Sequence, residues 1–376
     1  MRITGAVLER SGASTPFAAS RPFTVGTLEL DPPGPGELLV RIEAAGVCHS
    51  DLSVVDGNRV RPTPMLLGHE AAGVVEQVGE GVTDVAPGAR VVMTFLPRCG
   101  ECDACRTDGR LPCAPGTVAN NAGALVGGGV RLHRMGEDGG REDVHHHLGV
   151  SAFATHAVVD ASSVVPVDAG VPPEVAALLG CAVLTGGGAV LNAGRPAPGE
   201  RVIVVGLGGV GMAALLVAVA LGHEVIGVDA VPAKLDLARE LGAAGAWSPA
   251  DAVDRGIRAP VVIEAAGATR AFETAIALTA PGGTTVTVGL PAPDARASVS
   301  PLLLTAEART IVGSYLGSAV PSRDIPRYVD LWRAGRLPLE RLVSSRIRLD
   351  GIDEAMDRLA AGGELRQLIT FERTTS

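Results

Sequence analysis

One short glycine-rich segment restricts the fold of this chain more than any other feature. It follows the apolar run VIVV (202–205) and precedes a stretch rich in Ala, Leu and Val, so it joins a predicted strand to a predicted helix. This is the context in which a G-x-G-x-x-G pattern indicates a dinucleotide-binding unit. The residues of the pattern are Gly206, Gly208, Gly209, Val210 and Gly211.

Each glycine of this pattern has a physical role. Gly206 permits the tight turn, Gly208 lets the backbone approach a pyrophosphate, and Gly211 lets the helix pack closely on the strand. The free N–H groups at the helix N-terminus then face the phosphates. The alternative is a glycine-rich turn without a ligand, but strand, pattern and helix stand in the order that a dinucleotide site requires.

Strand and helix patterns alternate beyond this segment. Apolar strands are predicted at 224–228, 260–266 and 284–290, and helices at 233–243 and 270–280. Such alternation predicts an α/β domain with a parallel sheet and crossover helices.

Asp229 directly follows the predicted strand 224–228, about twenty residues after the glycines. A carboxylate there can accept hydrogen bonds from the adenosine ribose 2′-OH, and it would repel a 2′-phosphate. Ala230 and Val231 follow, so no arginine stands next to it to bind such a phosphate. The sequence therefore favours NAD(H) over NADP(H), with an ordinary surface aspartate as the alternative.

The first half of the chain has a different pattern. A length of 376 residues is too great for one simple core, so two domains are expected. Residues 1–95 contain short β-segments such as 37–47 and 71–79, bounded by Gly and Pro, and they predict a β-rich domain. Residues 106–147 are Gly-rich and polar without periodicity, so we expect a long surface excursion there.

Charge and hydropathy exclude several classes of protein. A net charge of −9 argues against a nucleic-acid partner, and the first ten residues lack the apolar segment of a secretory signal. Residues 202–222 are uncharged and long enough to span a bilayer, but five glycines interrupt them and a buried strand–turn–helix explains them better. We expect a cytoplasmic protein without a membrane or nucleic-acid partner.

Four cysteines lie within fifteen residues, in the spacing C-x2-C-x2-C-x7-C. Four thiolates can close a tetrahedron around Zn²⁺ and leave no position for a substrate, so the spacing predicts a structural zinc site. An iron–sulfur cluster fits less well, because the bacterial ferredoxin run ends in C-x3-C-P. The predicted ligands are Cys99, Cys102, Cys105 and Cys113.

The two other cysteines, in GVCHSDL and GCAVLTG, combine with the histidine of GHE. Two thiolates and one imidazole are a known ligand set for catalytic zinc, with a fourth position left for water or substrate. Each residue alone would be an ordinary core side chain. The predicted ligands are Cys48, His69 and Cys181, and the two sites together use all six cysteines.

These motifs resemble a known family. In order, GVCHSD, GHE, CGECDACRTDGRLPC, GCAVLTG and GLGGVG are similar to the zinc-dependent medium-chain alcohol dehydrogenases, over essentially the whole chain. The similarity is closest to the long-chain branch, which includes liver-type and glutathione-dependent formaldehyde dehydrogenases. The resemblance implies a GroES-like β-rich catalytic domain (1–182 and 316–376) and a Rossmann domain (183–315).

The resemblance also implies roles for residues around the catalytic zinc. Glu70 stands where the family has a carboxylate that can coordinate transiently, and Asp51 would orient His69. Ser50 would bond the substrate oxygen and accept its proton. The predicted substrate pocket consists of Phe95, His147 and Leu148, which favour an apolar or aromatic primary alcohol.

A further group of positions matches the family's cofactor contacts. Thr185 would touch the nicotinamide side, Lys234 would lie near the adenosine ribose, and Arg366 would bind the pyrophosphate. His49 stands where some members carry an arginine on the pyrophosphate, and a histidine could make NAD binding depend on pH. The positions that would frame the nicotinamide are Val288, Leu290 and Leu316.

The sequence also departs from the family pattern. The histidine that relays the proton in liver-type enzymes is replaced by Ser53, and no arginine follows Cys113 where glutathione-dependent enzymes carry one. The run of histidines at 145–147 could bind a metal, but a solvated loop entering a strand is the simpler expectation.

Hydride transfer between an alcohol and NAD is the leading functional hypothesis, with two zinc ions per chain and a homodimer or homotetramer in which the segment 308–316 could pair. Three alternatives stay open. The chain could oxidise thiol adducts of aldehydes, bind zinc and NAD without catalysis, or hold NAD tightly and need an external electron acceptor.

Overall fold

The computed structural model describes residues 1–136 and 139–371, and the chain forms two compact units. Unit 1 comprises Met1–Thr107, Leu111–Cys181 and the segment from Val343 onward. Unit 2 comprises Asp108–Arg110 and Ala182–Leu342. Each unit has its own buried apolar cluster, so each is described by itself.

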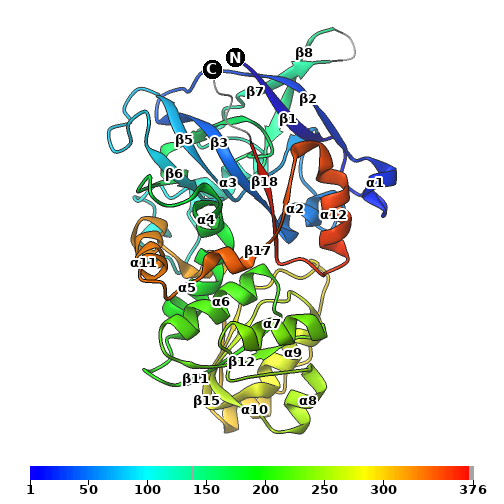
Figure 1. The fold of residues 1–376 in the computed structure, drawn as a ribbon, viewed down its shortest axis with the longest axis vertical. Helices are drawn as coiled ribbons and strands as arrows, with labels where there is room; N and C mark the ends of the chain where they lie inside the picture. Colours follow the sequence, from blue (N-terminus) through cyan, green and yellow to red (C-terminus); the bar gives the residue numbers. More distant parts are fainter. Residues whose placement is uncertain (137–138, 372–376) are drawn as a thin grey trace. The chain divides into compact units, whose positions relative to one another are not determined.

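Unit 1 contains a closed five-stranded barrel in the order β1-β2-β7-β8-β4. Figure 1 labels β1, β2, β7 and β8 of this barrel. The expectation of a surface excursion over residues 106–147 was wrong, because two strands from this segment pair with β2 and β4 and complete the barrel. Their short, polar sequences, LHRM and REDVHH, carry no clear alternation. The strands are β1 (Arg2–Leu8), β2 (Phe23–Leu30), β4 (Met65–Leu66), β7 (Leu132–Met135) and β8 (Arg141–His146).

A second, seven-stranded sheet completes unit 1, in the order β10-β6-β5-β3-β18-β17 with β9 also on β3. The predicted strands 37–47 and 71–79 appear here as β3 (Glu37–Val47) and β5 (Ala71–Val78). The other strands are β6 (Arg90–Met93), β9 (His156–Asp160), β10 (Val164–Val167), β17 (Val343–Ile347) and β18 (Arg366–Thr370). The helices of this unit are α1 (Phe17–Ser20), α2 (His49–Val55), α3 (Ala114–Ala122), α4 (Pro173–Leu178) and α12 (Ile352–Ala360).

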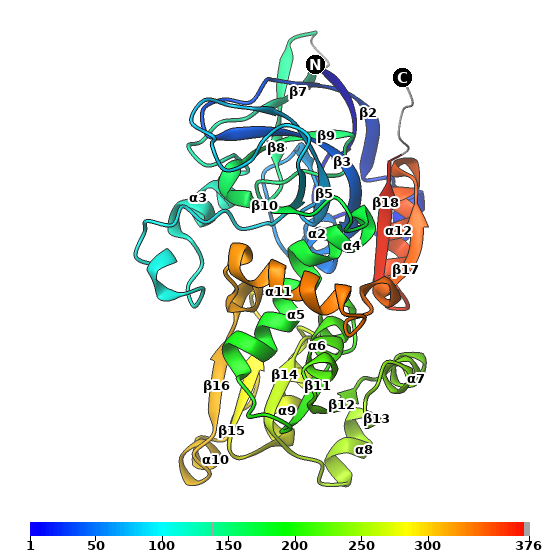
Figure 2. The ribbon, with the colours of Figure 1, turned by 60° about the vertical axis from the view of Figure 1, so that its left-hand side comes forward.

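Unit 2 is built on a six-stranded parallel sheet in the order β13-β12-β11-β14-β15-β16, which Figure 2 shows from β16 to β13. The predicted parallel sheet is therefore confirmed. Its strands are β11 (Arg201–Val205), β12 (Glu224–Val228), β13 (Gly245–Trp247), β14 (Ala259–Glu264), β15 (Thr279–Thr287) and β16 (Thr310–Gly313). The helices include α5 (Leu184–Gly188), α6 (Gly209–Ala220), α7 (Pro232–Glu240), α8 (Pro249–Asp254), α9 (Thr269–Leu278), α10 (Pro301–Ala306) and α11 (Pro321–Arg333).

The segment 316–342 lies in unit 2, whereas the predicted catalytic domain included it. Glycines explain how closely it packs on α5. A Cβ added to Gly188 would lie 2.3 Å from the carbonyl oxygen of Gly317, and one added to Gly187 would lie 2.6 Å from the hydroxyl of Tyr328. A side chain at either glycine would push this segment off the helix.

Among the described residues, one helical run, Pro173–Gly194, is long and apolar enough to cross a membrane. Within its most apolar 18-residue window, 89% is buried inside the protein. Helices that are apolar on all sides are also found in protein cores. The uncharged stretch 202–222, which is also long enough to span a bilayer, folds as β11 and α6 as predicted.

Candidate metal centres and active site

The structure brings Cys48, His69 and Cys181 together in unit 1. Their ligand atoms all lie within 4.8 Å of one another, and the three residues are 5%, 1% and 4% exposed. The Sγ of Cys181 lies 3.5 Å from Nε2 of His69. Two thiols and one imidazole at this spacing suit a zinc ion that keeps one open position, so the donor set fits the predicted metal.

Local structure explains how residues far apart in the sequence meet here. Cys48 precedes α2, where its N–H donates to Oδ2 of Asp51 at 3.0 Å. Cys181 lies in a π-helical turn, η3 (Leu179–Val183), a conformation that often marks functional sites. Beside it, a Cβ added to Gly180 would lie 2.1 Å from the carbonyl oxygen of Met93, so only glycine allows this close approach to β6.

Asp51 supports the imidazole of His69 from behind. Its Oδ1 lies 3.0 Å from Nδ1 of His69, which leaves Nε2 of the ring toward the thiols. Burial alone would raise the pKa of Asp51, but the charge of His69 and the contact with His147 outweigh it and lower the pKa to about 2. Asp51 is therefore an anion that fixes the orientation of the ring.

Glu70 and Arg366 form a second buried pair beside the cluster. Nε of Arg366 lies 3.3 Å from Oε1 of Glu70, and the two side chains are 2% and 0% exposed. Burial raises the pKa of Glu70 to about 7, although the Arg366 charge opposes the shift. Nη1 of Arg366 also donates to the carbonyl of Val47 at 3.4 Å. Its predicted role on a pyrophosphate stays a prediction.

The two cluster thiols differ in acidity. A hydrogen bond from Cys181 lowers the pKa of Cys48 well below its usual range, with help from the Arg366 charge and against the effect of burial. The same hydrogen bond and burial raise the pKa of Cys181. Cys48 is thus the more acidic of the two thiols, and binding of a metal by both would release their remaining protons.

Two of the predicted pocket residues, Phe95 and His147, lie beside His69. The ring of Phe95 meets the ring of His69 edge-on at 5.5 Å, and Leu148 is 7% exposed with a φ of 52°. His147 turns Nδ1 to Asp51, at 3.2 Å. The expected solvated loop at 145–147 is wrong, because His145 and His146 lie in β8 and His146 and His147 are buried.

The remaining predicted residues of α2 lie in its first turns. Ser50 is half-buried and His49 is exposed. The hydroxyl of Ser53 donates to the carbonyl of His49 at 2.8 Å. Ser50 directly follows the exposed His49 and lies two residues from Cys48, on the helix that Cys48 begins.

The four other cysteines also gather, on a lobe that we define as residues 99–113. Their Sγ atoms all lie within 4.8 Å of one another. Cys99 is exposed, Cys102 is partly exposed, and Cys105 and Cys113 are buried. Backbone N–H groups of Ala114 and Cys105 lower the pKa of Cys102 to about 6, whereas burial raises the pKa of Cys105 to about 12. A closed four-thiolate zinc site fits this geometry.

Unit 2 presents the glycine turn in the predicted form. Gly206 has a φ of 89°, and a Cβ there would lie 2.6 Å from Ala266. A Cβ on Gly211 would lie 1.8 Å from the carbonyl oxygen of Gly206, whereas one on Gly208 would meet no atom within 4 Å. Gly208 therefore borders open space at the start of α6, and this cradle fits a pyrophosphate.

Asp229 lies just after β12, beside the glycine turn. Its Oδ2 accepts the N–H of Leu207 at 2.6 Å and its Oδ1 accepts the N–H of Val231 at 2.8 Å. Lys234, the third residue of α7, is partly exposed. The carboxylate thus ties the glycine turn to the end of the neighbouring strand.

The other predicted cofactor positions also lie in unit 2. Thr185 is 7% exposed in α5, and Leu316 is 3% exposed with a φ of 51°. Val288 and Leu290 follow the end of β15 rather than lying within it, and Leu290 is 47% exposed.

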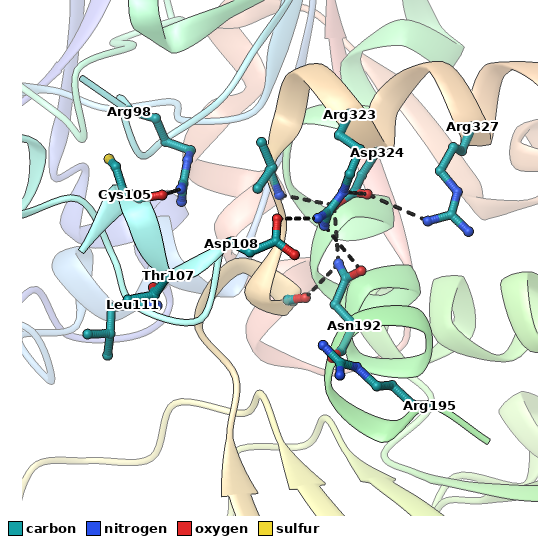
Figure 3. Close-up of polar contacts among 12 residues, drawn as sticks. Arg98, Cys105, Thr107, Asp108, Leu111, Asn192, Arg195, Arg323, Asp324 and Arg327 are labelled. Atoms are coloured by element: carbon teal, nitrogen blue, oxygen red, sulfur yellow. Dashed lines mark hydrogen bonds and ion pairs between the residues drawn. The ribbon is translucent and has the colours of Figure 1, made fainter. Parts of the chain in front are cut away.

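Sequence reasoning missed a polar network that supports the turn carrying Leu316. Asp324 is fully buried and accepts the N–H of Val320 at 3.0 Å and the amide of Asn192 at 3.1 Å. The Asn192 amide also donates to the carbonyl of Gly317 at 3.3 Å. Figure 3 shows these side chains with Arg323, which binds Asp324 and, at 2.6 Å, Asp108. No motif or spacing in the sequence signals this network.

Comparison with known proteins agrees with this geometry. Residues 34–169 match the family described as the alcohol dehydrogenase GroES-like domain, and residues 209–334 match the zinc-binding dehydrogenase family. A protein of Mycobacterium tuberculosis provisionally named alcohol dehydrogenase D is 38% identical over 98% of this chain and 100% of its own length. The chain belongs to the zinc-dependent medium-chain alcohol dehydrogenase family.

Two further members of this alcohol dehydrogenase family extend the comparison. The NDMA-dependent alcohol dehydrogenase of Amycolatopsis methanolica is 36% identical, with 96% of this chain and 98% of that protein covered. The crystal structure of benzyl alcohol dehydrogenase from Acinetobacter calcoaceticus superposes with a TM-score of 0.89 at 30% identity, over 99% of this chain and 100% of the other. The predicted combination of a GroES-like domain and a Rossmann domain is confirmed. Membership of the long-chain branch stays a prediction.

Proposed function

We propose that this alcohol dehydrogenase transfers a hydride between an apolar or aromatic primary alcohol and NAD, with one catalytic and one structural zinc ion per chain. The buried cluster of Cys48, His69 and Cys181, with ligand atoms within 4.8 Å, is the observation that carries the proposal. A structural or sensory protein has no need of three convergent ligands that leave a fourth position open.

The residues of unit 1 hold and orient the reacting groups. Cys48, His69 and Cys181 would hold the catalytic zinc, which when bound polarises an alcohol or carbonyl oxygen as a Lewis acid. Asp51 keeps the His69 ring in place at 3.0 Å. Ser50 would bond the substrate oxygen and relay its proton, releasing its own hydroxyl proton as it accepts the one from the substrate. Glu70 would approach the metal only transiently, since its carboxylate is paired with Arg366.

The residues of unit 2 would hold the cofactor. The open side of Gly208 and the N-terminus of α6 suit the pyrophosphate, and Asp229 suits a ribose 2′-OH rather than a 2′-phosphate. Bound NAD supplies the hydride acceptor. Lys234 near the ribose, and Thr185, Val288, Leu290 and Leu316 near the nicotinamide, complete the proposed contacts in this unit.

Phe95, buried against the ring of His69, and Leu148 favour an apolar or aromatic substrate. The structural similarity to a benzyl alcohol dehydrogenase supports the same choice. Oxidation of a glutathione adduct is a weaker alternative, because the segment after Cys113 reads Ala-Pro-Gly-Thr without an arginine.

A second candidate function keeps the same chemistry but a different fate for the electrons. The relative from Amycolatopsis methanolica is named for its dependence on NDMA. This name favours the alternative in which NAD stays bound between turnovers and an external acceptor takes the electrons. The contacts of the glycine turn would be the same in both cases.

Two further parts of the proposal concern location and assembly. All six cysteines, each within the described residues, are free thiols, which suits a reducing cytoplasm. Strand β16 lies at the edge of the sheet of unit 2, and Leu302 and Leu303 of the neighbouring α10 are 74% and 40% exposed. A second copy could pair along this edge in a homodimer or homotetramer.

The deciding experiment measures zinc per chain and turnover on the same sample. We expect about two zinc ions and NADH formation from NAD⁺ and benzyl alcohol. Parallel reactions contain NDMA without added NAD⁺, or formaldehyde with glutathione, and analysis of the heat-denatured protein detects nicotinamide that was retained. One zinc ion and no turnover in any reaction would overturn the proposal, and turnover with NDMA alone would select the second candidate.

A further inference from the structure

His147 contacts Asp51, the carboxylate that orients the predicted zinc ligand His69. Its Nδ1 lies 3.2 Å from Oδ1 of Asp51, the same oxygen that lies 3.0 Å from Nδ1 of His69. The rings of His147 and His69 meet edge-on at 5.5 Å and 88°. Asp51 is therefore bracketed by two imidazoles, and the side chains of all three residues are at most 2% exposed.

The backbone holds the His147 ring in this place. The N–H of His147 donates to Oγ of Ser151 at 2.9 Å, and its carbonyl accepts the N–H of Val150 at 3.1 Å. Leu148 and Ser151 both have a φ of 52°, so the chain turns sharply directly after β8. A tight, internally bonded turn leaves the ring little freedom to leave Asp51.

Asp51 in turn connects to both sides of the cluster. Its Oδ2 accepts the N–H of Cys48 at 3.0 Å, and its Oδ1 lies 3.2 Å from the N–H of Gly68, the residue before His69. A rotation of this carboxylate would therefore disturb two zinc ligands together. Without His147, a space the size of an imidazole would open beside Oδ1 and permit such a rotation.

We propose that His147 is a positioning residue, which fixes Asp51 and through it the orientation of His69 for metal binding. This inference rests on the proposed zinc site. It assigns to His147 a role in metal affinity, apart from any contact with the substrate. Removal of a partner that orients a ligand typically weakens metal binding about 10- to 100-fold. His147 acts one step further out, so about tenfold is expected.

The test compares variants by their zinc affinity, measured by competition with a chromophoric chelator. His147→Phe keeps a ring without a nitrogen, and His147→Asn restores an amide near the position of Nδ1. The control is His156→Phe, because His156 contacts Glu76 and Thr155 instead of Asp51. We expect about tenfold weaker binding of one of the two zinc ions in His147→Phe, near wild-type binding in His147→Asn, and no change in the control.

Two outcomes would overturn the inference alone. Zinc affinity in His147→Phe could equal that of the wild type, or KM for benzyl alcohol could rise while both zinc ions are held normally, which would make His147 a pocket residue. A wild-type protein that binds only one zinc ion would overturn the proposed function as well. If His147→Phe loses both ions by unfolding, the smaller apolar variant His147→Leu takes its place.

Discussion

The two cysteine clusters differ in where their ligands come from. The lobe draws all four thiols from residues 99–113, whereas the buried cluster draws its ligands from three distant segments that β3, β4 and the π-helical turn place together. A local site can form as soon as its own short segment folds around a metal. An assembled site exists only when the surrounding domain has folded.

Their surroundings differ in the same way. Charged side chains surround the buried cluster, with Asp51 behind His69 and the Glu70–Arg366 pair beside Cys48. In the lobe, backbone N–H groups face the sulfurs instead. The N–H of Cys105 donates to Sγ of Cys102 at 3.4 Å and the N–H of Cys99 to Sγ of Cys113 at 3.5 Å. The charged groups around the buried cluster can adjust the reactivity of a bound metal, whereas the backbone groups of the lobe can only hold a metal in place.

The largest effect is expected from Cys181→Ser. A serine hydroxyl is a poor zinc ligand, so the variant should lose one of two zinc ions. A bound zinc ion, acting as a Lewis acid, stabilises the charge of the transition state by several kcal/mol. Each 1.36 kcal/mol of this stabilisation changes the rate by a factor of ten. Turnover of benzyl alcohol should fall by about a thousandfold or more.

Zinc content, turnover and the melting temperature of Cys181→Ser are measured together. The melting temperature should change by only a few degrees, because the scaffold of unit 1 stays intact. A variant with one zinc ion and undiminished turnover would show that the buried cluster is not the active site. Cys99→Ser, which alters the exposed ligand of the lobe, is the matched control for the loss of a thiol.

Cys113→Ser, in the lobe, is expected to lower the stability of the protein and to leave turnover nearly unchanged. Structural zinc contributes to folding directly, so the variant should lose the other zinc ion and melt at least about 5 °C lower. The lobe should also become a substrate for trypsin, which cleaves after arginine, at Arg106 and Arg110. Turnover per folded chain should stay within about threefold of wild type, since charge stabilisation of the reaction comes from the buried cluster.

Digestion followed by mass spectrometry, together with the melting curve, checks this prediction. If trypsin also cleaved Cys181→Ser at Arg106 and Arg110, the prediction that the two clusters act independently would be wrong. Asp108→Ala gives a useful reference, because it removes the polar contact between Asp108 and Arg323 while the four thiols stay in place (Figure 3). A partly exposed ion pair contributes at most about 1 kcal/mol, so this variant should resist trypsin better than Cys113→Ser.

This comparison also shows what the sequence could predict. The lobe and the glycine turn could be read directly, because their function depends on spacing within one short segment. Strands β11, β12, β14 and β15 of unit 2 could be predicted to within about five residues, because Val and Ile runs such as 202–205 are buried on both faces of a parallel sheet. The three-residue strand β13 was missed. The barrel strands β7 and β8 were missed, because segments of only four and six residues, with few apolar side chains, carry too little periodicity.

The contacts behind the ligands could not be predicted from residue patterns. The resemblance to a family pointed to Asp51 behind His69, but it placed His147 in the substrate pocket, whereas the fold also brings its Nδ1 to Asp51. The Asn192–Asp324 network was missed altogether, since its residues are 132 positions apart and belong to no motif. Such contacts depend on tertiary packing, which leaves no local signal in the sequence.

The smallest predicted effect concerns His146 in the barrel of unit 1. It separates the loss of stability in acid that is caused by this histidine from the loss that is caused by release of the metal. His146 is 1% exposed, and its Nε2 accepts the N–H of Arg131 at 3.0 Å, so the ring must be neutral. Burial and the nearby Arg131 charge lower its pKa from 6.5 to about 3. The unfolded chain therefore binds a proton below pH 6.5 that the folded chain refuses, and stability present above pH 6.5 is lost as the pH falls toward 3.

His146→Gln keeps an acceptor for Arg131 but cannot titrate, so its stability should depend less on pH. The difference in unfolding free energy between wild type and variant should shift by up to about 1.4 kcal/mol per pH unit below pH 6.5, in favour of the variant. Urea midpoints at pH 7.0, 5.5 and 4.5 measure it. Metal loss at low pH affects both proteins alike, so it cancels in the difference. A difference that stays constant over this range would mean that a protonated His146 fits the barrel, and that acid acts on this unit only through its metal ligands.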